Sequence, residues 1–107
     1  MTHSGNLFAY FNDNYFADNV GTFTITINSF VVNIDSASNY WTLIGLFSPG
    51  SYPYTITGSA TISVPGWSSY DANGVGYTPP VSPGVAPSGF VAPGLISYSI
   101  VGKIICT

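Results

Sequence analysis

The sequence predicts an all-β fold, an antiparallel β-sandwich in a single domain that spans residues 1–107. Three observations support this prediction. Apolar residues alternate with threonines in the clearest segment, turn-forming Pro-Gly and Asn-Gly pairs separate the apolar segments, and no segment shows the helical spacing of apolar residues. Short strands separated by frequent turns are typical of a sandwich. A chain of this length buries about two thirds of its unfolded surface around one core.

The first two strands are expected at residues 7–11 and 21–28. The segment Leu7–Phe11 is rich in aromatic residues. In Gly21–Asn28, phenylalanine and isoleucine alternate with threonine, which is the pattern of a strand with one buried face. The residues between them are rich in Asn and Asp and predict a turn. We therefore expect these two strands to pair, with this acidic loop at their joined end.

The remaining strands follow the same reasoning. We expect them at Phe30–Ile34, Tyr40–Leu46, Tyr52–Val64 with a break at Gly58, and Leu95–Ile105. The segment Tyr77–Gly94 is too rich in proline and glycine for a central strand and has no charged residue. It is interpreted as an Ω-like loop over one end of the sandwich.

The charge composition excludes several classes of function. Charged residues make up 5% of the chain, the net charge is −3, and Lys103 is the sole Lys or Arg. A nucleic-acid-binding surface requires clustered cations, so nucleic acid is not an expected partner. No apolar run has the length of a membrane span, and no signal peptide is recognisable. We expect a soluble protein without membrane insertion, and the sequence leaves open whether it is exported or displayed at the cell surface.

The acidic loop, residues 11–24, is the strongest candidate site. It holds Asp13 and Asp18, two of the four carboxylates in the chain, together with three asparagines. Since almost no cation is present to neutralise them, these oxygen-bearing side chains are suitable ligands for a hard cation, above all Ca²⁺. The alternative is that they form two ordinary turns, in which Asn and Asp are favoured.

Two further segments carry a resemblance to a known family. The turn Gly66–Tyr70 (Gly-Trp-Ser-Ser-Tyr), followed by Pro93–Ile96 and Val101–Ile104, resembles the soluble bacterial galactose-binding lectins of the LecA type, and so does the acidic loop. The resemblance implies a galactose-binding-domain-like, jelly-roll-like sandwich and calcium-dependent binding of a galactose-like sugar. In that family, two adjacent sugar hydroxyls coordinate the bound calcium directly.

The resemblance also implies which residues form the site. The implied calcium ligands are the side chains of Asp13, Asp18 and Asn19, the backbone carbonyl of Tyr70, and a further carbonyl from Phe16 or Ala17. The sugar is expected to lie against Asp13, Asn14, Asp18, Tyr70, Tyr77 and Phe90.

The sequence departs from the family in the order of its segments, in a missing strand and in its long loop. The acidic loop precedes the Gly-Trp-x-x-Tyr turn, which is the reverse of the family's order and implies a circular permutation. A strand of the family pattern is also missing, so the sheet is expected to have an open edge that favours a homo-oligomer. Moreover, the long loop lacks the His and Gln that bind galactose in the family, so the choice of sugar is less well supported than the calcium.

Catalysis is not expected. The single His3 and the single Cys106 lie at opposite ends of the chain, and no nucleophile has an evident base. Asp13 and Asp18 are better suited to share a cation than to divide acid and base roles. Two alternatives to a lectin remain: a structural or adhesion module with calcium-stabilised loops and no sugar, and a metal-free sandwich that associates through its open edge.

Overall fold

The computed structural model describes residues 3–17, 19–62, 68–76 and 84–106, and over these residues it forms eight strands and no helix. The all-β prediction is confirmed. The described residues thus offer no helix of the length and apolar character that crossing a bilayer requires. The strands are β1 (Gly5–Phe11), β2 (Thr22–Ile27), β3 (Phe30–Asp35), β4 (Thr42–Phe47), β5 (Tyr54–Gly58), β6 (Ala60–Ile62), β7 (Ser68–Tyr70) and β8 (Ile100–Cys106).

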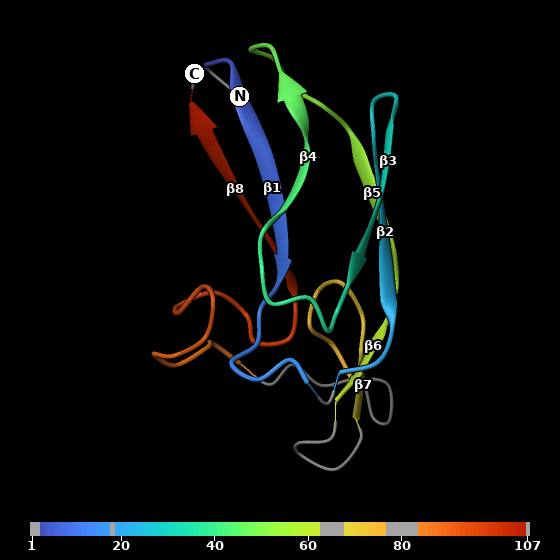
Figure 1. The fold of residues 1–107 in the computed structure, drawn as a ribbon, viewed down its shortest axis with the longest axis vertical. Coiled ribbons are helices and arrows are strands. Elements are labelled where there is room, and N and C mark those ends of the chain that lie inside the picture. The colour runs from blue at the N-terminus through green and yellow to red at the C-terminus, as the bar shows by residue number, and fades with distance from the viewer. Residues whose placement is uncertain (1–2, 18, 63–67, 77–83, 107) are drawn as a thin grey trace.

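The strands form three small antiparallel sheets. One has the order β4-β1-β8, the second β3-β2-β5, and the third consists of β6 and β7. Figure 1 shows the two three-stranded sheets facing each other, with the start of β1 and the end of β8 at one end of the molecule, and the acidic loop and the segment 84–99 at the other. The core between the sheets includes Phe11, Phe23, Ile34 and Ile62, all almost completely buried. The architecture is therefore sandwich-like.

The alternating segment forms β2, as predicted. Phe23, Ile25 and Ile27 are buried, whereas the threonines between them are exposed or half-buried. β2 is the central strand of its sheet, because β3 pairs with one edge and β5 with the other. The threonine face is therefore the outer face of this sheet, and the phenylalanine and isoleucine side chains cover the core.

The predicted pairing of the first two strands is wrong. β1 pairs with β4 and β8, and β2 pairs with β3 and β5, so the two strands belong to different sheets. The rings of Phe11 and Phe23 stack across the core, with centroids 5.7 Å apart. Both strands thus bury apolar faces against each other rather than joining edges, and the connection between them is long enough to cross from one sheet to the other. The acidic loop is this crossing.

Other boundaries also differ from the sequence prediction. The break at Gly58 is confirmed: this residue has φ of +111°, and the chain continues as β6 from Ala60. Residues 63 and 64, at the end of the same predicted strand, lie outside the described residues. Leu95–Ser99 is not a strand, since Tyr98 has φ of +61° and the backbone of this segment bonds to loops instead. The short strand β7 was not predicted.

Candidate functional site

Asn12 fixes the acidic loop to the segment 84–99. Its side chain is completely buried, and its Nδ2 donates to the carbonyl oxygens of Ala92 (3.2 Å) and Ile96 (2.9 Å). Its Oδ1 accepts from the N–H of Ala92 at 2.9 Å. Its backbone N–H donates to Ser99, and its carbonyl accepts from Tyr98. One buried side chain therefore bonds to three backbone groups and holds two loops together at one end of the sandwich.

Asp13 follows directly and is also buried, with 4% of its surface exposed. Its Oδ1 accepts hydrogen bonds from the backbone N–H groups of Asn14 (2.7 Å) and Tyr15 (3.3 Å), which is a turn capped by its own side chain. Its Oδ2 accepts from Nδ2 of Asn19 at 2.8 Å. The buried carboxylate is thus surrounded by neutral N–H donors.

Asn19 closes the loop and contributes an oxygen that has no partner. The side chain is 5% exposed, and its Nδ2 donates both to Asp13 and to the carbonyl oxygen of Ser36 (2.9 Å). The reversed amide would point Oδ1 at those two oxygens, so the partners determine its orientation. Oδ1 is then buried without a hydrogen bond among the described residues. An oxygen in this position normally binds an ordered water or a cation.

The loop is anchored to the connection between β3 and β4. Both the backbone N–H and the Oγ of Ser36 donate to the carbonyl oxygen of Gly21, at 3.0 and 2.8 Å. Together with the bond from Asn19, these contacts hold the two segments side by side. An open depression of about 450 Å³ lies between them, lined by Asn14, Tyr15, Phe16, Ala17, Ala37 and Asn39. Tyr15 is 62% exposed there, and Asn14 and Asn39 supply amide groups at the surface.

The structure brings together some of the predicted site residues. Asp13 and Asn19 are hydrogen-bonded, and Asn14 and Ala17 line the adjoining depression. Asp18 and Tyr77 lie outside the described residues.

Tyr70 and Phe90 are placed differently. Tyr70 is buried in β7, where its ring packs on Tyr98 with centroids 5.0 Å apart. β6 lies between β7 and the end of the acidic loop, because Thr61 pairs with Ser69 and also bonds to Val20. The ring of Phe90 likewise packs on Tyr98, at 5.7 Å. The next residue, Val91, donates to the backbone carbonyl of Asp13 at 3.2 Å, so the segment carrying Phe90 borders the acidic loop.

Sequence reasoning missed the residues contributed by the β3–β4 connection. Ser36, Ala37 and Asn39 show no motif, and only the contact between two distant loops brings them to the site. Tyr15 carried a usable signal, since a tyrosine in a loop of polar residues is a plausible ligand contact. By contrast, the turn predicted by the Asn-Gly pair at positions 73 and 74 is present: the Asp71 carboxylate accepts from the N–H groups of Asn73 and Val75.

No protein-family model matches the chain, and neither the curated proteins nor the solved structures contain a match. The function is accordingly argued from the geometry of the site.

Proposed function

We propose that the protein is a calcium-dependent carbohydrate-binding module that holds a sugar in the depression beside the acidic loop. One observation carries the proposal: the buried Asp13 carboxylate and the Oδ1 of Asn19, which has no partner among the described residues, lie in the loop whose neighbouring residues line an open, mixed polar and aromatic depression.

The lining of the depression suits a sugar. A pyranose presents hydroxyl groups at its rim and an apolar C–H face, so an aromatic ring and amide groups together complement it. Tyr15 offers the exposed ring, and Asn14 and Asn39 offer amides that both donate and accept. The volume falls within the range of small-molecule sites. A galactose-like mono- or oligosaccharide is the first ligand to test.

The donor chemistry fits a calcium ion. Ca²⁺ takes six to eight oxygen ligands, commonly carboxylate and amide oxygens. Asp13 and Asn19 would hold it here, since the carboxylate keeps lone pairs beyond the three hydrogen bonds it accepts, and the Asn19 Oδ1 accepts none from the residues that the structure describes. Bound calcium would supply a cation that the hydroxyl oxygens of a sugar can coordinate. Asn14 and Tyr15, adjacent to Asp13 in the chain, would orient the sugar above it.

Thermal unfolding with and without calcium tests the metal. With a dissociation constant of roughly 10⁻⁴ M, about 10 mM calcium adds about 2.7 kcal/mol to the free energy of unfolding, a rise in Tm on the order of ten degrees. Asp13→Asn should abolish the shift. Asp35→Asn is the matched control, because the Asp35 carboxylate also caps a turn but is exposed. Equal Tm values in calcium and in EDTA would refute the calcium site.

Binding to immobilised galactose and other monosaccharides tests the sugar. Tyr15→Ala should remove binding, whereas Tyr54→Ala should not, because Tyr54 is equally exposed (65%) but lies on β5, away from the depression. Loss of binding in both variants, or in neither, would contradict the proposed position of the sugar.

A structural calcium-stabilised module is the second candidate, and one observation favours it. The three N–H donors around Asp13 already stabilise its charge and fix the loop without any ligand. A calcium-dependent Tm without binding to any sugar of the set would support this alternative over the lectin.

A further inference from the structure

The edge strand β8 is regular along its whole length. All seven of its residues pair with β1, from Cys106 opposite Gly5 to Ile100 opposite Phe11, without a bulge. No strand of the described residues pairs with its other edge, and Figure 1 shows β8 on the outside of its sheet. Ile104 is 46% exposed and Ile105 50%. An exposed, regular, apolar edge of this kind is a template for another strand.

The other edge strands carry features that discourage such pairing. The register between β4 and β1 shifts at Leu7 and Phe8. β3 carries an exposed aspartate, Asp35. β5 is short, directly follows Pro53 and ends at Gly58. Bulges, charges, prolines and short length are the usual protections of sheet edges. β8 has no proline and no carboxylate, and its one charged residue is Lys103.

Backbone alternation shows which groups of β8 face outward. The N–H of Ile100 donates to the carbonyl of Ala72 rather than to β1, so the polar groups of Ile100 point away from β1. In an antiparallel strand this direction alternates from residue to residue. Gly102, Ile104 and Cys106 therefore present their N–H and C=O groups at the outer edge, where no strand of the described residues pairs with them, while Lys103 and Ile105 bond to β1.

A second copy of the chain can satisfy these groups by symmetric antiparallel pairing. A two-fold axis at Lys103 would place two like charges opposite each other, which is unfavourable. An axis at Ile104 instead pairs Ile104 of one copy with Ile104 of the other. It also pairs Gly102 of each copy with Cys106 of the other copy. In this register all three outward-facing residues bond, and Lys103 lies beside the apolar Ile105. We propose that two copies of the chain pair in this way, through β8, into one continuous six-stranded sheet.

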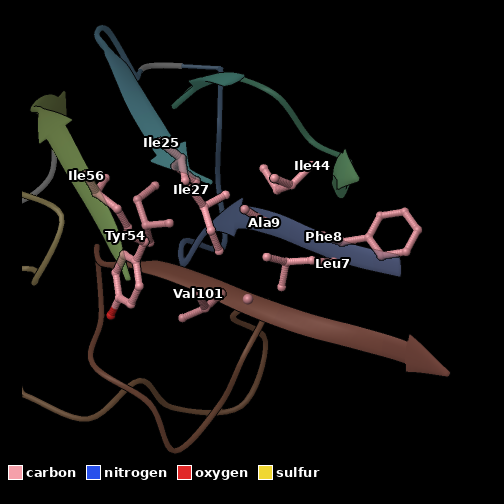
Figure 2. A pocket seen from close by; sticks show the side chains of 11 residues that line it. Leu7, Phe8, Ala9, Ile25, Ile27, Ile44, Tyr54, Ile56 and Val101 are labelled. Atoms are coloured by element: carbon pink, nitrogen blue, oxygen red, sulfur yellow. The ribbon is translucent and has the colours of Figure 1, made fainter. Parts of the chain in front are cut away.

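The apolar groove beside β8 supports this choice of partner. Figure 2 shows it between β1 and β8 on one side and β2 and β5 on the other, with Leu7, Ala9, Ile25 and Ile27 pointing into it. It encloses about 210 Å³, and Tyr54 stands at its β5 side. Ile104 shares the core-facing side of its sheet with its pairing partner Leu7. The added β8 of a second copy would extend this sheet over the opening and place its own Ile104 beside the groove.

The mass of the protein in solution tests the dimer. We expect the wild type to have the mass of a dimer by light scattering, and Ile104→Lys to have that of a monomer, because the substitution places two cations opposite each other. Leu43→Lys is the matched control: Leu43 is 53% exposed on the edge strand β4 and should leave the dimer intact. A monomeric wild type at its highest soluble concentration, or a dimeric Ile104→Lys variant, would overturn the proposal.

Cysteine crosslinking tests the register without relying on a destabilised variant. In a Cys106→Ser background, Ile104→Cys should form a disulfide-linked dimer on mild oxidation, since directly paired Cα atoms lie about 5.5 Å apart, within disulfide range. Lys103→Cys should not form this disulfide, because the two residues at position 103 are diagonal neighbours in the paired strands, with Cα atoms about 7–8 Å apart. Crosslinking by Lys103→Cys alone would refute the register, and crosslinking by neither would refute pairing through β8. Neither test requires calcium or a sugar, so this inference stands or falls independently of the proposed function.

Discussion

Two regions of the molecule bury their residues by different means. One is the loop end, formed by the acidic loop and residues 84–99, and the other is the side that carries the edge strands β5 and β8. At the loop end, buried polar side chains form specific hydrogen bonds, as Asn12 does with Ala92 and Ile96. On the β5–β8 side, Leu7 and Ile27 line a groove that remains open. Hydrogen bonds are directional and define one arrangement of the loops. Apolar burial is not directional, so any apolar surface of suitable shape can cover the groove. The first region is therefore suited to hold a small polar ligand, and the second to receive another chain.

The largest expected effect comes from the core that joins the two regions. Phe23 is completely buried and stacks on Phe11 across the two sheets. Phe23→Ala should lower the free energy of unfolding by about 3–5 kcal/mol, because it removes apolar contacts and leaves a cavity. Denaturant unfolding measures this. Val31→Ala, at an exposed position of β3, should change it by less than about 0.5 kcal/mol. Equal effects of the two substitutions would show that Phe23 is not at the centre of the core.

Asn12→Ala tests the polar end directly. The substitution leaves the N–H and carbonyl of Ala92 and the carbonyl of Ile96 without a side-chain partner. We expect a loss of about 2–4 kcal/mol in the free energy of unfolding, since each buried unsatisfied group costs about 1–3 kcal/mol and water can reach part of the loop. Hydrogen exchange at the Ala92 amide should accelerate.

Asn33→Ala is the control for Asn12, because it removes a single exposed hydrogen bond, from Thr24 Oγ1 to Asn33 Oδ1. Its effect should stay within about 0.5 kcal/mol. If the exchange rate at Ala92 were unchanged in Asn12→Ala, the loop would not depend on this side chain, and the contrast between the two regions would be lost.

The fold class was accessible from sequence, but the relation between the sheets was not. The alternation of Phe23, Ile25 and Ile27 specifies a strand with one buried face, and that local pattern survives in β2. It does not specify which strand pairs with which, so β1 and β2 were paired incorrectly. Stacking of Phe11 on Phe23 across the core is a long-range contact with no local signal.

The same distinction applies to the candidate site. Asp13 and Asn19 were predicted because their oxygen-bearing side chains are concentrated in a short segment. Ser36 and Asn39 were not, since they reach the site only through the contact between two distant loops. The role of Asn12 was also hidden: its sequence context suggested a turn or a ligand, whereas its hydrogen bonds to residues 80 and 84 positions away show that it holds two distant segments together.

Ser36→Ala should have a smaller effect than Asn12→Ala, although Ser36 is equally buried. The lost bond runs from Oγ to the carbonyl oxygen of Gly21 at 2.8 Å, but that oxygen still accepts from the Ser36 N–H at 3.0 Å. We expect a loss of about 0.5–1.5 kcal/mol in denaturant unfolding. A loss as large as that of Asn12→Ala would show that the hydrogen bond from Ser36 Oγ to the acidic loop contributes as much to the free energy of unfolding as the hydrogen bonds of Asn12 to residues 84–99.

The smallest effect is expected at Tyr10, a polar group in aromatic surroundings on the outer side of the β4-β1-β8 sheet. Its ring packs against Phe16 and Trp41, each at 5.2 Å between centroids, and burial raises the pKa of its hydroxyl above the ordinary 10.0. The unfolded chain ionises at lower pH than the folded one, so the contribution of Tyr10 to stability is full below pH 10.0 and is lost as the pH rises toward the folded pKa.

Stability measured across this alkaline range should therefore fall more steeply in the wild type than in Tyr10→Phe. The comparison of the two proteins isolates the Tyr10 hydroxyl, because every other titratable group is the same in both. Parallel pH profiles would show that the Tyr10 hydroxyl remains hydrated in the folded state. A steeper profile in the wild type would show that this side of the sheet excludes water from a hydroxyl that has no hydrogen-bond partner among the described residues, in contrast to the side chains of Asn12 and Asp13 at the loop end.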